Sequence, residues 1–197
     1  MVEGGIYDQI SGGFFRYATD SQWQIPHFEK MLYDNGLLLT LLSQACITSG
    51  SGRYHRVIEQ TGRWIIDAMQ SPAGGYYSSL DADSRPAANG SSQSDQLVEG
   101  AYYLFKSEQA QQLLNEEQWQ VISRRFGLDQ PANFNGQWHL TSQQSIAQIA
   151  SELRLSSKRV VVVLTGAMQL LEAARQNRPW PGRDEKTITA WNGLMIR

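Results

Sequence analysis

The stretch Ile25–Leu39, IPHFEKMLYDNGLLL, places titratable side chains in front of a block of leucines. Pro26 suits the first turn of a helix, where an amide hydrogen has no partner inside the helix. From Phe28 to Ile47 the sequence is apolar almost all the way round, which predicts a helix that is buried on most sides. We therefore expect this helix to lie inside the fold, with its polar start at an opening.

The polar start of this helix has a regular spacing. His27, Lys30 and Asp34 are placed at i, i+3 and i+7 on one face, while Glu29 and Tyr33 fall on another. The spacing of Lys30 and Asp34 permits an ion pair, and a buried charge persists only when it is paired or hydrogen-bonded. Two interpretations remain open. One is a structural ion pair beside a histidine, and the other is a general acid/base at the mouth of a cavity.

The rest of the chain predicts helices joined by short turns. Tyr54–Met69 follows the i, i+3, i+4, i+7 rule of an amphipathic helix. The run Val160–Leu164 favours a strand locally, but the helical period continues beyond it, so we predict a helix there. The other predicted helices span Gly4–Ile10 (the end of a longer helix), Ser107–Leu114, Glu116–Phe126, Ser142–Leu153, Lys158–Gln176 and a last segment from about Lys186.

Two irregular excursions, each led by a pair of glycines, interrupt the helices. Gly12-Gly13 ends the first predicted helix and leads into a hairpin-like stretch over residues 14–24. Gly74-Gly75 begins the second excursion, in which residues 76–80 and 101–105 read as short extended pieces. Residues 85–96 between them are rich in Ser, Asn, Ala and Gln, which predicts a solvated loop. A short strand is also expected at residues 136–140.

Length and composition limit the class of protein. With 197 residues, 41% of them hydrophobic and 18% charged, the sequence predicts one packed domain or part of a larger one. The net charge of -2 gives no electrostatic footprint for nucleic acid. No apolar run approaches the roughly 20 residues of a membrane span. There is no secretory signal, and the single Cys46 has no internal disulfide partner. We expect a cytoplasmic protein with neither nucleic acid nor membrane as a partner.

Three carboxylates near the second excursion are candidates for catalysis. Asp81 and Asp83 are spaced i, i+2, which places them on one face of a strand or at the corners of a turn. Glu99 begins the next aromatic stretch and is a third carboxylate that can approach them. Their spacing does not match a calcium loop, and the glycine pairs do not form a phosphate-binding motif. We therefore expect neither a metal site nor a cofactor.

Trp191 and Asn192 lie near the start of the last predicted helix. An asparagine side chain both donates and accepts hydrogen bonds, and a tryptophan offers a flat face, so the pair suits a sugar ring. The alternative is a buried tryptophan beside an asparagine that binds the backbone.

Four segments in order resemble the motifs of one family. They are GGIYDQISGGFFRYATDSQWQIPHFEKMLYDN (4–35), GGYYSSLDADS (74–84), EGAYYLF (99–105) and RPWPGRDEKTITAWNGLMI (178–196). They are similar to the thioredoxin-fused family that includes the spermatogenesis-associated protein 20 of animals. The resemblance implies a thioredoxin-like domain followed by an (α/α)6 barrel, similar to N-acylglucosamine 2-epimerases and six-hairpin glycosidases. Residues 1–197 would be the front-middle part of that barrel, without the thioredoxin-like domain. The expected fold is mainly α, a partial helical barrel with short β-hairpin excursions and with both ends cut inside helices.

In barrels of this kind, ligands sit where the ends of inner helices meet long loops. The resemblance therefore implies a site for a sugar-like small molecule. Its catalytic candidates are His27, Asp81, Asp83 and Glu99, and its substrate-binding candidates are Arg16, Tyr17, Trp23, Lys30, Trp191 and Asn192. The chain departs from the family pattern at Phe15, where a histidine is common. A mechanism that uses the side chain of that histidine is therefore not available to this chain.

Two functional hypotheses follow. The first is a carbohydrate-active enzyme. Epimerisation or isomerisation would use His27, and hydrolysis would use two carboxylates about 5–5.5 Å or about 6.5–9.5 Å apart. The second is a non-catalytic scaffold that presents a ligand or a protein to the thioredoxin-like domain. Because a cut barrel exposes apolar helix faces, we also expect these faces to be covered by a second copy of the chain.

Overall fold

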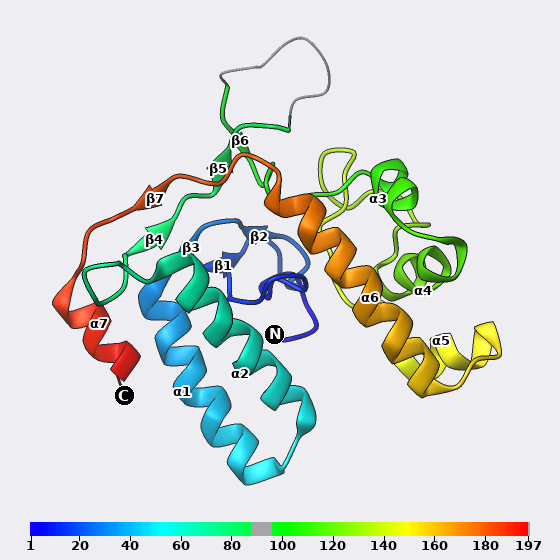
Figure 1. Cartoon of the computed structure of the whole chain (residues 1–197), viewed down its shortest axis with the longest axis horizontal. Helices are drawn as coiled ribbons and strands as arrows, with labels where there is room; N and C mark the ends of the chain where they lie inside the picture. The colour runs from blue at the N-terminus through cyan, green and yellow to red at the C-terminus, as the bar shows by residue number, and fades with distance from the viewer. Residues whose placement is uncertain (88–95, 197) are drawn as a thin grey trace.

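The computed structural model describes residues 1–87 and 96–196. Two groups of helices stand on either side of a central region of loops and short strands (Figure 1). The protein is therefore mainly α, as the sequence predicts. None of the described helices combines the length and the apolarity needed to cross a membrane.

The first group is a helical hairpin. α1 (Leu32–Ser49) and α2 (Gly52–Trp64) are antiparallel, and α2 continues as one π-helical segment, η1 (Ile65–Met69). α7 (Thr189–Ile196) packs against α1, although the two are far apart in sequence. The contact is close, because a Cβ added at Gly36 would lie 2.9 Å from the sulfur of Met195.

The second group surrounds a long helix. α6 (Ser157–Gln176) contains the valine run, with Val160 and Val163 buried and the two valines between them exposed, so the helical prediction is confirmed. Asn115 and Ser145 cap the starts of two shorter helices through reciprocal bonds with the glutamine three residues later. The shorter helices are α3 (Ser107–Leu113), α4 (Glu116–Phe126) and α5 (Ile146–Leu153).

The central region holds three small antiparallel sheets. β1 pairs with β2, β3 with β4 and β4 with β7, and β5 with β6. The strands are β1 (Tyr17–Ala18), β2 (Pro26–His27), β3 (Lys30–Met31), β4 (Ser79–Leu80), β5 (Asp83–Ser84), β6 (Val98–Glu99) and β7 (Arg183–Asp184). These pairings bring both predicted excursions together, and they bring the start of the first helix next to them.

The helix predicted from Phe28 begins only at Leu32, so its first turn is wrong. Residues 26–31 instead form two strands. Their side chains alternate, with Phe28 and Lys30 fully buried and His27 and Glu29 only partly buried. This period of two is the signature of a strand. Pro26 fits there equally well, because the ladder does not use its missing amide hydrogen.

Other boundaries also differ from the predictions. Gly4–Ile10 is a series of turns, and only Tyr7 pairs, with Phe14. The two glycines at 12 and 13 both have positive φ, and this tight turn lets the amide of Asp8 donate to the carbonyl of Gly13. The expected strand at 136–140 is reduced to isolated bridges. The helices predicted from Ser142 and Lys186 begin later, at Ile146 after the cap Ser145 and at Thr189. Residues 88–95 of the expected loop lie outside the described residues.

Two glycine-led loops are bound to helix starts in the same way. Asn35, in the first turn of α1, accepts from the amide of Phe14 at 2.7 Å and donates to its carbonyl at 3.0 Å. Asn192, in the first turn of α7, makes the same pair of bonds with Tyr76, at 2.7 and 3.0 Å. Each asparagine also donates to the carbonyl four residues before it. The same arrangement therefore occurs twice. Two glycines precede an aromatic residue, and the backbone of that residue is bound by an asparagine that is distant in sequence and is followed by a glycine. We call this arrangement the asparagine unit.

Candidate functional site

The predicted site begins at the β1–β2 hairpin. Tyr17 and His27 are cross-strand partners, and their rings stack with centroids 5.0 Å apart and planes 6° apart. Tyr17 is 48% exposed, so one side of this stack is open to solvent. A flat, exposed aromatic ring over a titratable imidazole is a surface on which a ring-shaped polar ligand can stack.

Two carboxylates lie near the imidazole of His27. Its Nδ1 is 3.9 Å from Glu29 Oε2, and its Nε2 is 4.0 Å from Glu99 Oε1. Both distances are too long for hydrogen bonds, and Nδ1 has no hydrogen-bond partner among the described residues. An imidazole that is not engaged in a hydrogen bond is able to exchange a proton with a ligand.

The other two catalytic candidates lie next to this pair. Asp83 in β5 is the cross-strand partner of Glu99 in β6. Asp81, two residues earlier, lines an open cavity of about 330 Å³ together with Glu29. Each of the other three predicted catalytic residues is therefore a neighbour of Glu29 or of Glu99: His27 of both, Asp81 of Glu29 and Asp83 of Glu99. We call His27, Glu29, Asp81, Asp83 and Glu99 the acid/base face.

The acid/base face extends to the start of α1 through Arg16. Its guanidinium lies 2.9 Å from Glu29 Oε2 and also interacts with the hydroxyl of Tyr33. Burial raises the pKa of Asp34 to about 6, the charge of Glu29 adds to this effect, and Arg16 opposes it. Asp34 Oδ2 is buried without a hydrogen-bond partner among the described residues. Asp34 is therefore a carboxyl group that titrates near neutral pH beside the predicted site.

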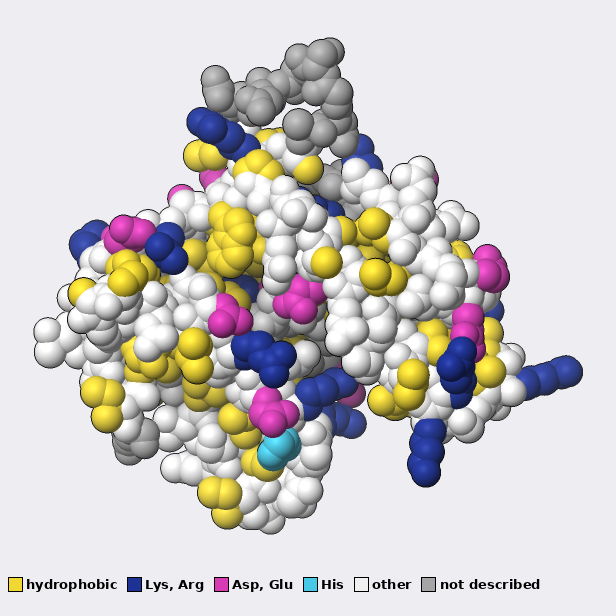
Figure 2. All heavy atoms as spheres, in the orientation of Figure 1, with side chains coloured by type: hydrophobic (Ala, Val, Ile, Leu, Met, Phe, Trp, Pro, Cys, Tyr) yellow, Lys and Arg dark blue, Asp and Glu magenta, His cyan; other side chains and the backbone are white. Residues whose placement is uncertain are grey.

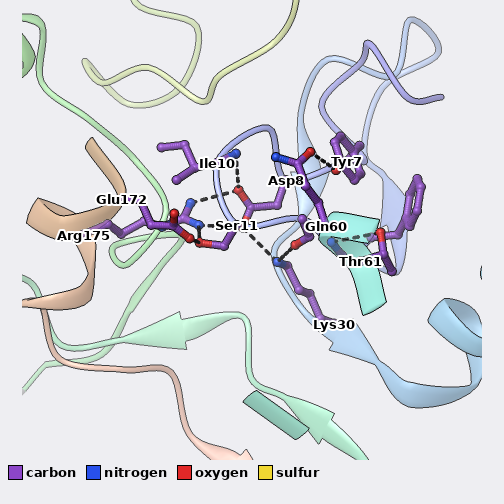
Figure 3. A network of polar contacts seen from close by, with 12 residues as sticks. Tyr7, Asp8, Ile10, Ser11, Lys30, Gln60, Thr61, Glu172 and Arg175 are labelled. Carbon is purple, nitrogen blue, oxygen red and sulfur yellow. Dashed lines mark hydrogen bonds and ion pairs between the residues drawn. The ribbon is translucent and has the colours of Figure 1, made fainter. Parts of the chain in front are cut away.

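Lys30 does not belong to this face. It is completely buried, and its ammonium donates to Asp8 Oδ2 and to the carbonyl of Gly12, both at 2.8 Å (Figure 3). The predicted ion pair between Lys30 and Asp34 is therefore wrong. The physical reason is the strand conformation of β3, which points Lys30 to the opposite side from Glu29.

Asp8 is the centre of a buried ionic network. Its two oxygens accept from two nitrogens of Arg175, each at 2.9 Å, and one of them also accepts from Lys30 (Figure 3). Burial alone would raise the pKa of Asp8, but Arg175 and Lys30 hold it well below its usual range. Arg175 also donates to the hydroxyl of Ser11 at 2.6 Å, and this hydroxyl donates to Glu172 at 2.9 Å.

Aromatic rings complete the surroundings of Lys30. Its nitrogen lies 4.7 Å from the ring centroid of Trp64, 4.9 Å from Phe15 and 5.2 Å from Tyr103. Burial lowers the pKa of Lys30 to about 8, and the charge of Asp8 opposes this shift. Phe15, the departure from the family pattern, thus forms part of an aromatic enclosure for a buried cation.

The remaining substrate-binding candidates serve other contacts. Asn192 binds the backbone of Tyr76, as in the structural interpretation of this residue. Trp191 packs edge-on against Tyr33, with ring centroids 4.8 Å apart. Trp23 is exposed in the turn between β1 and β2, where it adopts a φ of 59°.

The residues predicted for the site do not include four charged residues that the structure places there or in the neighbouring network: Asp8, Glu29, Asp34 and Arg175. The alternation of apolar and polar residues in His-Phe-Glu-Lys was the available signal for Glu29, because it places Glu29 beside His27 in a strand. No local pattern connects Asp8 with Arg175, since 167 positions separate them.

No family model matches the chain. The human protein named spermatogenesis-associated protein 20 is 35% identical over an alignment that covers the whole chain and 27% of the human protein, and the rat protein of the same name gives the same values. A Caenorhabditis elegans protein named "Uncharacterized protein B0495.5" is 31% identical over the whole chain and 29% of its own length. The chain is thus a homologue, over its entire length, of about a quarter of spermatogenesis-associated protein 20.

Proposed function

We propose that the acid/base face belongs to a carbohydrate-active enzyme that epimerises or isomerises a sugar-like small molecule. The observation that carries the proposal is the imidazole of His27, which lies within 4.0 Å of two carboxylates and beneath an exposed tyrosine ring. General acid/base catalysis requires a group with a pKa near the working pH, placed where a substrate can reach it. The imidazole of histidine is the side chain that most often serves as such a group in enzymes.

In this proposal the sugar lies against the exposed edge of the Tyr17–His27 stack, where it contacts both rings, and His27 takes the proton that the reaction removes. Glu99 and Glu29 stabilise the imidazolium that forms. Asp34, whose pKa is raised to about 6 by burial, is our candidate for the group that returns a proton. Arg16 holds Glu29 in place and limits its motion.

Hydrolysis is a second candidate reaction, favoured by the pairing of β5 with β6. Asp83 and Glu99 are directly opposite each other, and cross-strand partners have Cβ atoms about 4.5–5.5 Å apart. Retaining glycosidases hold their two carboxyl groups about 5–5.5 Å apart. This pairing supports a covalent mechanism in which one carboxylate would attack and the other would donate a proton.

We also infer that the chain is part of an (α/α)6 barrel, on the basis of its antiparallel helix pair and its repeated asparagine unit. The longer protein would combine this barrel with a thioredoxin-like domain in the cytoplasm. A non-catalytic scaffold for that domain is the alternative function. It would bind a sugar or a protein at the same face without transferring protons.

Deuterium exchange distinguishes these functions. The intact protein is incubated in D₂O with a panel of monosaccharides. NMR then follows the incorporation of deuterium at the ring carbons, including the carbon next to the anomeric carbon. We expect exchange with the natural protein and a loss of about 100-fold or more in His27→Ala.

His55→Ala is the matched control. Its Nδ1 lies 3.4 Å from Glu59, a similar histidine–carboxylate pair, but on an exposed part of α2. We expect its exchange rate to match that of the natural protein. Equal exchange in His27→Ala and the natural protein would exclude His27 as the base. Ligand binding without exchange would support the scaffold, and release of a free sugar from a glycoside would support hydrolysis.

A further inference from the structure

A second cavity, of about 120 Å³, lies between α2, α6 and the N-terminal segment. One water needs roughly 10–15 Å³ of the space that a water-sized sphere can reach, so this cavity has room for a small ring. Side chains of both charge signs gather in the middle of the face shown in Figure 2. The six charged residues that line the cavity are Asp8, Lys30, Arg63, Asp67, Glu172 and Arg175. None of them belongs to the acid/base face.

Several polar groups of this cavity have unused hydrogen-bonding capacity. Nε of Arg175 and the hydroxyl of Tyr103 are buried, and neither has a partner among the described residues. The side chains of Arg63 and Asp67 are exposed and make no hydrogen bond or ion pair within the described part of the chain. Glu172 receives one bond, from Ser11. A buried donor without a partner costs about 1–3 kcal/mol, so a ligand that satisfies it gains affinity.

Aromatic rings form the apolar part of the lining. Trp64 and Tyr102 are buried at the cavity wall, and Trp180 is 49% exposed at its margin. The rings of Tyr102 and Trp180 are 5.3 Å apart and inclined by 41°. Such rings bind the C–H faces of a ligand and leave its edges to the polar groups.

The charges of the cavity balance, with three acids and three bases among its lining residues. A net anion or cation would find as many repulsive as attractive groups, whereas a neutral molecule that both donates and accepts can use both kinds. We propose that this cavity binds a neutral polyhydroxylated ring, at a site separate from the acid/base face. The ring stacks beside Trp180 and Tyr102 and exchanges hydrogen bonds with Asp67, Glu172 and the unpartnered donors. The inference rests on the cavity itself and not on the proposed enzymatic activity.

Saturation-transfer NMR on the intact protein tests this site with a panel of neutral monosaccharides and inositol, together with acetate as an anionic probe and methylammonium as a cationic probe. We expect saturation transfer to at least one neutral ring and to neither charged probe. Asp67→Asn and Trp180→Ala should each weaken binding by about tenfold or more. Both residues are exposed and both substitutions only remove surface groups, so the fold is retained, which circular dichroism checks.

Asp129→Asn is the matched control, because Asp129 is also exposed but does not line the cavity. Its affinity for the ring should equal that of the natural protein. The proposal is overturned if no neutral ring binds, or if acetate or methylammonium binds in its place. It is also overturned if His27→Ala abolishes ring binding while Asp67→Asn does not, since the ligand would then occupy the acid/base face.

Discussion

At the scale of single residues, three buried charges dominate the interior. Asp8, Lys30 and Arg175 are each less than 4% exposed, and together they connect the N-terminal segment, β3 and α6. Removing charges from water costs several kcal/mol per ion, and a well-placed pair only roughly compensates for this cost. The network therefore adds little net stability. It fixes which segments meet, because any other arrangement would leave a buried charge unpaired.

His139 provides a prediction at the same scale. Burial lowers its pKa to about 4, although its Nε2 contacts the carbonyl of Gly5 at 2.7 Å. The folded state thus binds its proton less tightly than the unfolded state, whose pKa is about 6.5. The stabilising contribution is complete above pH 6.5 and is lost as the pH falls from 6.5 to 4. His139 alone should contribute a loss of about 3 kcal/mol over this range, which is measured as the difference in urea unfolding between the natural protein and a variant without this ring.

His139→Gln removes the titrating ring and keeps a hydrogen-bond donor. Its unfolding free energy should fall less steeply between pH 6.5 and 4 than that of the natural protein. Asp34, whose pKa is raised, changes stability in the opposite sense over the same range, but it does so equally in both proteins. Identical slopes would mean that His139 does not titrate as its burial requires.

At the scale of elements, residues 25–31 show how a local pattern can fit two structures. A helix explains the spacing of His27, Lys30 and Asp34, while a strand explains the alternation of buried and partly buried side chains. The pairing with β1 and β4 decided between them, because it buried Phe28 and Lys30 on one side and left His27 outside. The rest of the predicted helix is confirmed as α1, but it is not buried on most sides, because Leu37, Leu41 and Ile47 are exposed.

The repeated asparagine unit gives a prediction for elements. Asn35→Ala removes three hydrogen bonds and leaves the buried amide and carbonyl of Phe14 unpaired. We expect a loss of about 2–4 kcal/mol in urea unfolding. Asn177→Ala is the control, because this exposed asparagine makes a single bond at the end of α6 and should cost far less. Equal losses in the two variants would show that the unit contributes no specific stability.

At the scale of the whole molecule, apolar side chains on α1 and α6 remain uncovered. Ile47 is 85% exposed, Leu41 57% and Val162 62%. The relatives are about four times as long as this chain, so further segments of a longer protein are one source of cover. The prediction that a second copy covers these faces stays a prediction.

Solution scattering on the chain of 197 residues tests whether a second copy covers these apolar faces. We expect a mass of at least twice that of the monomer at micromolar concentration, because exposed apolar surface of this kind favours association. A double substitution, Leu41→Glu with Ile47→Glu, should shift the mass toward the monomer. Gln44→Glu, which changes the charge of the same helix without removing apolar surface, should not. A strictly monomeric natural chain would contradict self-association through these faces.

The sequence by itself determined the helices from Leu32 onward, the location of the loops between them and the relationship to spermatogenesis-associated protein 20. Helical periodicity and turn residues act over a few positions, so they can be read locally. The tertiary structure alone decided the strand at Lys30, the partners of this lysine and the meeting of His27 with Glu99. These depend on contacts between residues 22 to 167 positions apart, where the alternatives differ in which charges are buried and paired, and no local pattern in the sequence records that difference.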